Sequence, residues 1–141
     1  MSYNLDRFIK AQNLVYNSVI YELKSRRKYT HWMWYIFPQF DGLGYSHQTK
    51  FYAIKSLEEA KAYLEHTVLS KRLEECCNLL LDIENKSIEQ ILGYPDNLKL
   101  QSSMTLFNKV SNDKIFQDVL DKYFDGKEDI RTLELIEKEE D

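Results

Sequence analysis

One segment of the chain holds both tryptophans and two of the three histidines. It runs from residue 31 to residue 47 and reads HWMWYIFPQFDGLGYSH. Histidine titrates near neutral pH, so His31 is a candidate proton donor or acceptor, and Asp41 offers a carboxylate for the same purpose. We therefore predict His31 and Asp41 as the catalytic candidates, either of which could be the acid/base residue.

The same segment has residue types that bind flat and anionic ligands. Trp32 or Trp34 can stack on a base or sugar, although rings at this density also build ordinary cores. The Gly42-Leu43-Gly44 turn precedes a helix capped by Ser46, and backbone N–H groups exposed at such a place favour phosphate binding. The alternative is that these glycines form a plain turn without a ligand. The predicted ligand-binding residues, including two from a second stretch, are Trp32, Trp34, Gln39, Gly42, Gly44, Ser46, Lys99 and Ser103.

The second stretch, residues 96–107, reads DNLKLQSSMTLF and places a lysine among hydroxyl groups. A lysine such as Lys99 can bind phosphate or carboxylate as a point charge. Small hydroxyl residues inside a helix also permit close helix packing, so a purely structural role stays open. We predict that this stretch and residues 31–47 form one cleft.

Metal and redox chemistry find no support in the sequence. Neither an H-x-x-x-H nor a C-x-x-C pattern occurs, so we predict no metal site and no cofactor. Cys76 and Cys77 are adjacent in an apolar stretch, which predicts reduced thiols in the core.

Composition describes one globular domain over residues 1–141, with an acidic, fraying tail from about residue 137. Four glycines and two prolines in 141 residues predict an all-α fold of about seven short helices. The net charge of −4 argues against nucleic acid as the main partner, although the basic cluster at Lys24 to Lys28 keeps that alternative open. The absence of a long apolar run predicts a cytoplasmic protein without a membrane partner.

Helical spacing of apolar residues and capping signals place the elements. The first helix spans residues 5–23, with Asn4 as its expected cap, and residues 31–40 are expected to form a short helical or extended plug. Serine caps are expected at Ser46, Ser56 and Ser87. The remaining helices are expected near residues 46–52, 57–65, 67–81, 87–93, 95–110, 115–124 and 130–136.

The sequence resembles an uncharacterised, mostly bacterial family, domain of unknown function eighteen-ten, whose members are sometimes labelled calpastatin. The resemblance rests on HWMW, on FPQ with the G-L-G turn, and on SSMTLF, and it covers nearly the whole chain. It implies a mainly helical single domain and supplies no activity. A fainter similarity, through Met104, Phe107, Phe116 and the Val119-Leu120 pair, is to the small helical NADAR family, although Met and Phe are closer together here. It implies N-glycosidic or ADP-ribose-linked substrates.

We therefore predict a ligand-binding cleft, with a hydrolase or N-glycosidase acting on a nucleotide or ADP-ribose-like molecule as the leading hypothesis. A noncatalytic protein-interaction module with an exposed aromatic anchor is the alternative. Nucleic-acid binding through Lys24 to Lys28 is the second alternative.

Overall fold

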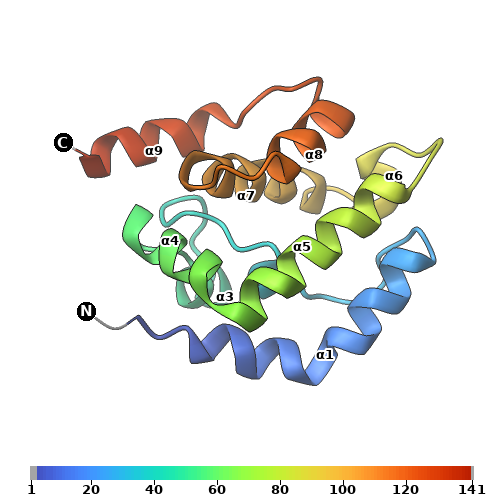
Figure 1. The fold of residues 1–141 in the computed structure, drawn as a ribbon, viewed down its shortest axis with the longest axis horizontal. Coiled ribbons are helices and arrows are strands. Elements are labelled where there is room, and N and C mark those ends of the chain that lie inside the picture. The colour runs from blue at the N-terminus through green and yellow to red at the C-terminus, as the bar shows by residue number, and fades with distance from the viewer. Residues whose placement is uncertain (1–2, 141) are drawn as a thin grey trace.

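The computed structural model describes residues 3–140, and within them the chain forms nine α-helices (Figure 1). The predicted all-α class is confirmed, but the predicted number of about seven is too low. No strand occurs in these residues, and Phe40 and Ile54 form an isolated parallel bridge. The helices are α1 (Asp6–Lys24), α2 (Met33–Ile36), α3 (His47–Tyr52), α4 (Leu57–Glu65), α5 (Thr67–Asp82), α6 (Ile88–Leu92), α7 (Asp96–Val110), α8 (Ile115–Phe124) and α9 (Ile130–Glu140).

The expected ranges cover eight of the nine helices in residues 3–140, and the other one, α2, lies in the segment expected as a plug. Helix α2 has four residues, which is one turn and too short for a helical period to be read from sequence. Trp32, Met33 and Ile36 are buried there, and a bend at Phe37 follows. The expected plug is thus one helical turn, followed by irregular chain up to the bridge at Phe40.

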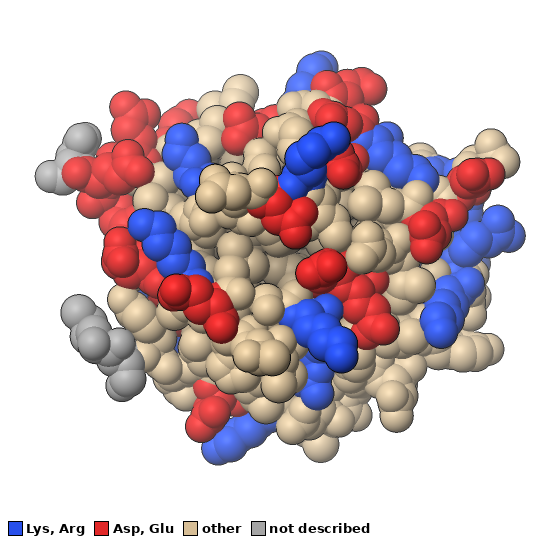
Figure 2. Space-filling view, viewed as in Figure 1, with Lys and Arg blue, Asp and Glu red and all other residues tan. Residues whose placement is uncertain are grey.

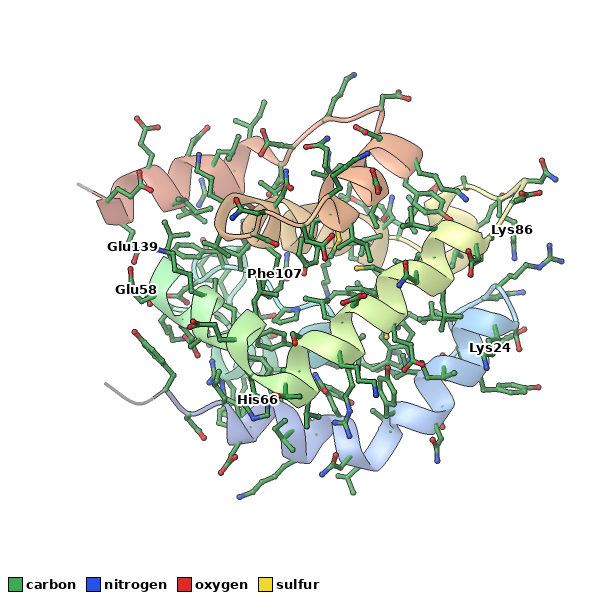
Figure 3. The ribbon with its side chains drawn as sticks, in the orientation of Figure 1. Lys24, Glu58, His66, Lys86, Phe107 and Glu139 are labelled. Atoms are coloured by element: carbon green, nitrogen blue, oxygen red, sulfur yellow. The ribbon has the colours of Figure 1, made fainter. Side chains whose placement is uncertain are left out.

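Helix α7 is the centre of the fold. It packs against α4, α6, α8 and α9 and also contacts α2. Leu100 through Phe107 are buried except for the half-buried Gln101, so the helix is covered on nearly every side. Phe107 lies in the interior, where its ring centroid is 5.2 Å from that of Tyr63 on α4 (Figure 3). A helix covered all round shows little apolar periodicity, which fits the mixed sequence of this stretch.

The capping signals are mostly confirmed. Ser46, Ser56 and Ser87 each accept a hydrogen bond from the backbone N–H three residues later. The expected Asn4 cap is wrong: Leu5 precedes α1 without a side-chain cap, and the Asn4 carbonyl accepts from the Arg7 guanidinium. An aspartate in the first turn, Asp6, still complements the positive end of the helix dipole.

Helix α9 closes the fold along one edge (Figure 1). The Asp129 carboxylate accepts hydrogen bonds from Ser102 of α7 and from the backbone N–H of Thr132. At the other end, the Glu139 carboxylate accepts from the Leu57 N–H at the start of α4, and Figure 3 places Glu139 beside Glu58. The last described helix is therefore attached to both α7 and α4.

None of the helices in residues 3–140 combines the length and the apolar character that crossing a membrane requires. Acidic and basic side chains are interspersed over the face in Figure 2, with acidic groups over α9 and several basic groups near the end of α1.

Candidate functional site

Two lysines, two tryptophans and one aspartate meet between α1, α2 and α7, and we call them the lysine–indole cluster. The Lys99 Nζ lies 5.4 Å from the centroid of the half-buried Trp34 ring. The Asp96 carboxylate lies 3.5 Å from Lys99 Nζ and 2.9 Å from Lys28 Nζ. Lys28 Nζ is in turn 5.2 Å from the Trp32 ring. The two lysines thus share the Asp96 carboxylate, and Lys99 lies beside the half-buried Trp34 indole.

A buried carboxylate on α1 positions the cluster. Glu22 accepts hydrogen bonds from the backbone N–H groups of Tyr29 and Thr30 at 2.7 and 3.0 Å, from the Thr30 hydroxyl at 2.6 Å and from the Trp32 indole N–H at 3.0 Å. Burial by itself would raise the pKa of Glu22, but the hydrogen bonds from Thr30, Tyr29 and Trp32 lower it below its usual value. Glu22 therefore stays ionised and fixes the segment that carries Lys28 and Trp32.

The hydroxyl residues of α7 divide between two faces. Ser102 donates to the Asp129 carboxylate at 2.9 Å, and the Thr105 hydroxyl accepts from the Asp129 backbone N–H at 2.9 Å. These two residues attach α9, as the packing interpretation of this stretch expects. Ser103 is one turn after Lys99 and fully buried, and its Oγ has no hydrogen-bond partner among the described residues. An unpaired buried hydroxyl is uncommon and costs free energy, which marks Ser103 as unusual.

A polar hollow of about 480 Å³ adjoins the cluster and shares Lys28 with it. Arg27 stacks over Tyr29 at 5.4 Å, and Lys86 donates to the Arg26 carbonyl at 2.7 Å. Figure 3 places Lys24 and Lys86 at the same end of the molecule. The hollow is lined by Arg27, Lys28, Lys86, Glu89, Gln90, Ile91, Leu92 and Gly93.

The glycine turn lines a different hollow, of about 610 Å³, together with Asp41. Neither Trp34 nor Lys99 is in that lining. Gly42 has a φ of +106°, and a Cβ there would approach the Leu135 side chain to 3.1 Å, while a Cβ on Gly44 would come within 2.8 Å of Thr49. Both glycines therefore have a conformational or packing reason to be glycine.

The other predicted residues have local contacts. His31 is exposed, and its carbonyl accepts from the Tyr35 hydroxyl at 3.3 Å. The Gln39 carbonyl accepts from the Ile54 N–H at 2.8 Å, beside the Phe40–Ile54 bridge. The Ser46 hydroxyl is occupied in capping α3. Of the predicted ligand-binding residues, Trp32, Trp34 and Lys99 come together, with Ser103 one turn further along α7.

Sequence comparison matches residues 2–136 to the family described as Protein of unknown function (DUF1810). The chain belongs to this family. The resemblance expected from HWMW, FPQ and SSMTLF is thus confirmed. Two of these motifs, HWMW and SSMTLF, contain Trp32, Trp34 and Ser103 of the region just described.

The DUF1810 chain also resembles a solved structure, that of the conserved hypothetical protein Rv1873 from Mycobacterium tuberculosis. The two are 49% identical, with a TM-score of 0.94 over 96% of this chain and 97% of the other. No curated protein matches the chain significantly.

Sequence reasoning missed three members of the region. Glu22 looks like any surface glutamate of an amphipathic helix, and only the path of the chain after α1 brings four donors to it. Asp96 looked like part of a helix start, and Lys28 like part of a solvated basic cluster. The ion pair between Asp96, in the first turn of α7, and the buried Lys28 is a tertiary contact, so the sequence alone could not indicate it.

Proposed function

We propose that the DUF1810 chain binds a nucleotide or ADP-ribose-like molecule at the lysine–indole cluster and hydrolyses its N-glycosidic bond. The observation that carries the proposal is the contact between Lys99 and the half-buried Trp34 ring, with Asp96 and Lys28 adjoining. A flat aromatic face beside two lysines suits a ligand that combines a ring with phosphate.

The charges near the cluster suit a diphosphate. Arg27 and Lys86 line the adjoining hollow, where Glu89 is the acidic lining residue. We expect a ligand with its base on Trp34 to place its phosphates toward Arg27 and Lys86, since the Lys28 side chain is 6% exposed and paired with Asp96. The volume of about 480 Å³ is in the range of small-molecule sites.

Asp96 supplies the carboxylate that N-glycoside hydrolysis requires. Hydrolysis breaks the bond between C1′ and the leaving nitrogen, and the oxygen of water bonds to C1′. One water proton stays on the new hydroxyl, and the other goes to the leaving group. Asp96 orients the water and stabilises positive charge that develops on the sugar. The exposed His31, adjacent to Trp32 in the sequence, is the proposed proton donor, whereas Asp41 lines the other hollow and lies outside the lysine–indole cluster.

Calorimetry with ADP-ribose tests binding, and Lys99→Met tests the site. We expect Lys99→Met to weaken binding about tenfold, equal to about 1.4 kcal/mol, because a charge-assisted contact is lost. Lys109→Met is the matched control, because Lys109 is an exposed lysine on the same helix. Equal affinities for both variants and the unsubstituted protein would exclude the cluster as the site.

Chromatographic detection of a released base tests the reaction, with NAD and nucleosides as substrates. We expect release that is lost in Asp96→Asn, while ADP-ribose still protects that variant against heat. Binding without release by the unsubstituted protein would refute the hydrolase assignment and leave a binding domain.

The two alternative functions have their own signatures. Exposed Tyr29 and Tyr94, at 64% and 72% exposure, favour the protein-interaction module, whose partner binding should survive Lys99→Met. Nucleic-acid binding should weaken steeply with salt. Lys28 contributes little to such a surface, because its side chain is 6% exposed and paired with Asp96.

A further inference from the structure

We propose that the groove along α3 is a second ligand site, for a small molecule that joins one planar ring to one anionic group. The groove consists of the 610 Å³ hollow beside the glycine turn and an adjoining hollow of about 460 Å³. The two share Lys50, Phe51 and Lys55, and none of their lining residues belongs to the lysine–indole cluster. This site therefore goes beyond the proposed function.

Aromatic rings are exposed along the groove. Phe51 is 46% exposed and Tyr45 is 86% exposed, although both rings have large apolar faces. His47 stacks on Phe51 with a centroid separation of 6.2 Å and an interplanar angle of 13°, and Tyr52 meets Phe51 edge-on at 4.8 Å. The supported Phe51 ring offers a fixed face for stacking.

The charges of the groove suit one anionic group. Lys55 is 3.7 Å from Asp41 and donates to the Lys50 carbonyl, and Arg7 is paired with Glu59 at 2.8 Å. Among the described residues, the Lys50 ammonium has no ion pair or hydrogen bond within the usual limits. One uncompensated cation favours a single phosphate or carboxylate over a polyanion, whose binding needs many such contacts.

The backbone of the groove is fixed before any ligand arrives. Arg7 donates to the carbonyls of Phe51 at 2.8 Å and Ala53 at 2.9 Å, and its partner Glu59 accepts from the Lys55 N–H at 2.8 Å. This buried ion pair thus connects α1 to both ends of the segment from Phe51 to Lys55. A preformed site loses little conformational entropy on binding, which favours small ligands.

Nuclear magnetic resonance with phenyl phosphate tests the site, since this probe joins one ring to one phosphate. We expect saturable shifts of the backbone amides of residues 45–51, with inorganic phosphate alone or phenol alone binding at least about fivefold more weakly. Benzoate, which replaces the phosphate with a carboxylate, shows which anionic group is preferred.

Substitutions locate the binding. We expect Lys50→Met and Phe51→Leu each to weaken phenyl phosphate binding about fivefold at residues 45–51, equal to about 1 kcal/mol, while Lys99→Met and the Lys109→Met control leave it unchanged. Shifts that do not saturate, or that persist in both groove variants, overturn the proposal. If oligonucleotides bind more tightly with each added nucleotide, the proposal of a small-molecule site is also overturned, because the groove then binds a nucleic-acid polymer. Because Lys99→Met affects only the first site, failure of either proposal can be told from failure of the other.

Discussion

Glu22→Gln should destabilise the protein by about 2 kcal/mol at neutral pH, because three N–H groups donate to the Glu22 Oε1. A glutamine oxygen can keep all three hydrogen bonds, but it loses the charge that strengthens each by about 0.5 to 1 kcal/mol. Glu22→Ala should cost about 3 to 4 kcal/mol, because the indole N–H of the fully buried Trp32 is then left without an acceptor.

The pH dependence gives the sharper test of this reasoning. Because the pKa of Glu22 is lowered in the folded protein from its ordinary value of 4.5, its contribution to stability is present above that value. The contribution is lost as the pH falls through the lowered pKa, where a protonated glutamic acid resembles glutamine. The free-energy difference between the unsubstituted protein and Glu22→Gln should therefore shrink from pH 7 to pH 3.

Urea unfolding at the two pH values, followed by circular dichroism, measures that difference. Iodide quenching of tryptophan fluorescence in a Trp34→Phe background, where Trp32 is the remaining tryptophan, should show Trp32 protected in Glu22→Gln and more accessible in Glu22→Ala. Equal stability of Glu22→Gln and the unsubstituted protein at pH 7 would refute the claim that this carboxylate is used in its charged form.

Three further experiments test other contacts. Arg7→Met should cost about 3 to 5 kcal/mol in urea unfolding by leaving the buried Glu59 charge unpaired, and adding Glu59→Gln should recover part of it. Ser103→Ala should be neutral or stabilising by up to about 1 kcal/mol, because the Ser103 hydroxyl has no partner among the described residues. Ser102→Ala should destabilise by about 1 kcal/mol, because the Ser102 hydroxyl donates to Asp129. The reverse order of stability in urea unfolding would contradict these assignments. Burial raises the pKa of Cys76 to about 12, so this thiol should react with a disulfide reagent at pH 8 only once urea is added, and fast reaction of the folded protein would contradict its burial.

The helices could be predicted wherever one face alone is buried. The apolar stripe of Ile115, Phe116, Val119 and Leu120 predicted α8 within its observed bounds, because that helix covers the core from one side. Ser87 and Gln90 likewise predicted the start of α6, where the full capping box is present. Such signals are local and need no knowledge of neighbours.

The site could be predicted only in part. Lys99 and Trp34 were marked by their residue types, and the structure brings them together. Asp41 was assigned to the same cleft because it follows the tryptophans in sequence, but the Phe40–Ile54 bridge and the turn at Gly42 lead the chain into a different hollow. Glu22 was missed because its role depends on donors from a turn whose path the sequence does not show.

Helix α9 has a consequence for how the protein can be cut or tagged. Leu135 covers Gly42, Asp129 is bound to α7, and Glu139 is bound to the start of α4. Deleting residues from 129 onward would uncover the glycine turn and remove the contacts that Asp129 makes with the Ser102 and Thr105 hydroxyls. Helix α9 therefore holds the glycine turn, α7 and the start of α4 together, and a fusion partner placed after this helix needs a linker that leaves the Glu139 contact in place.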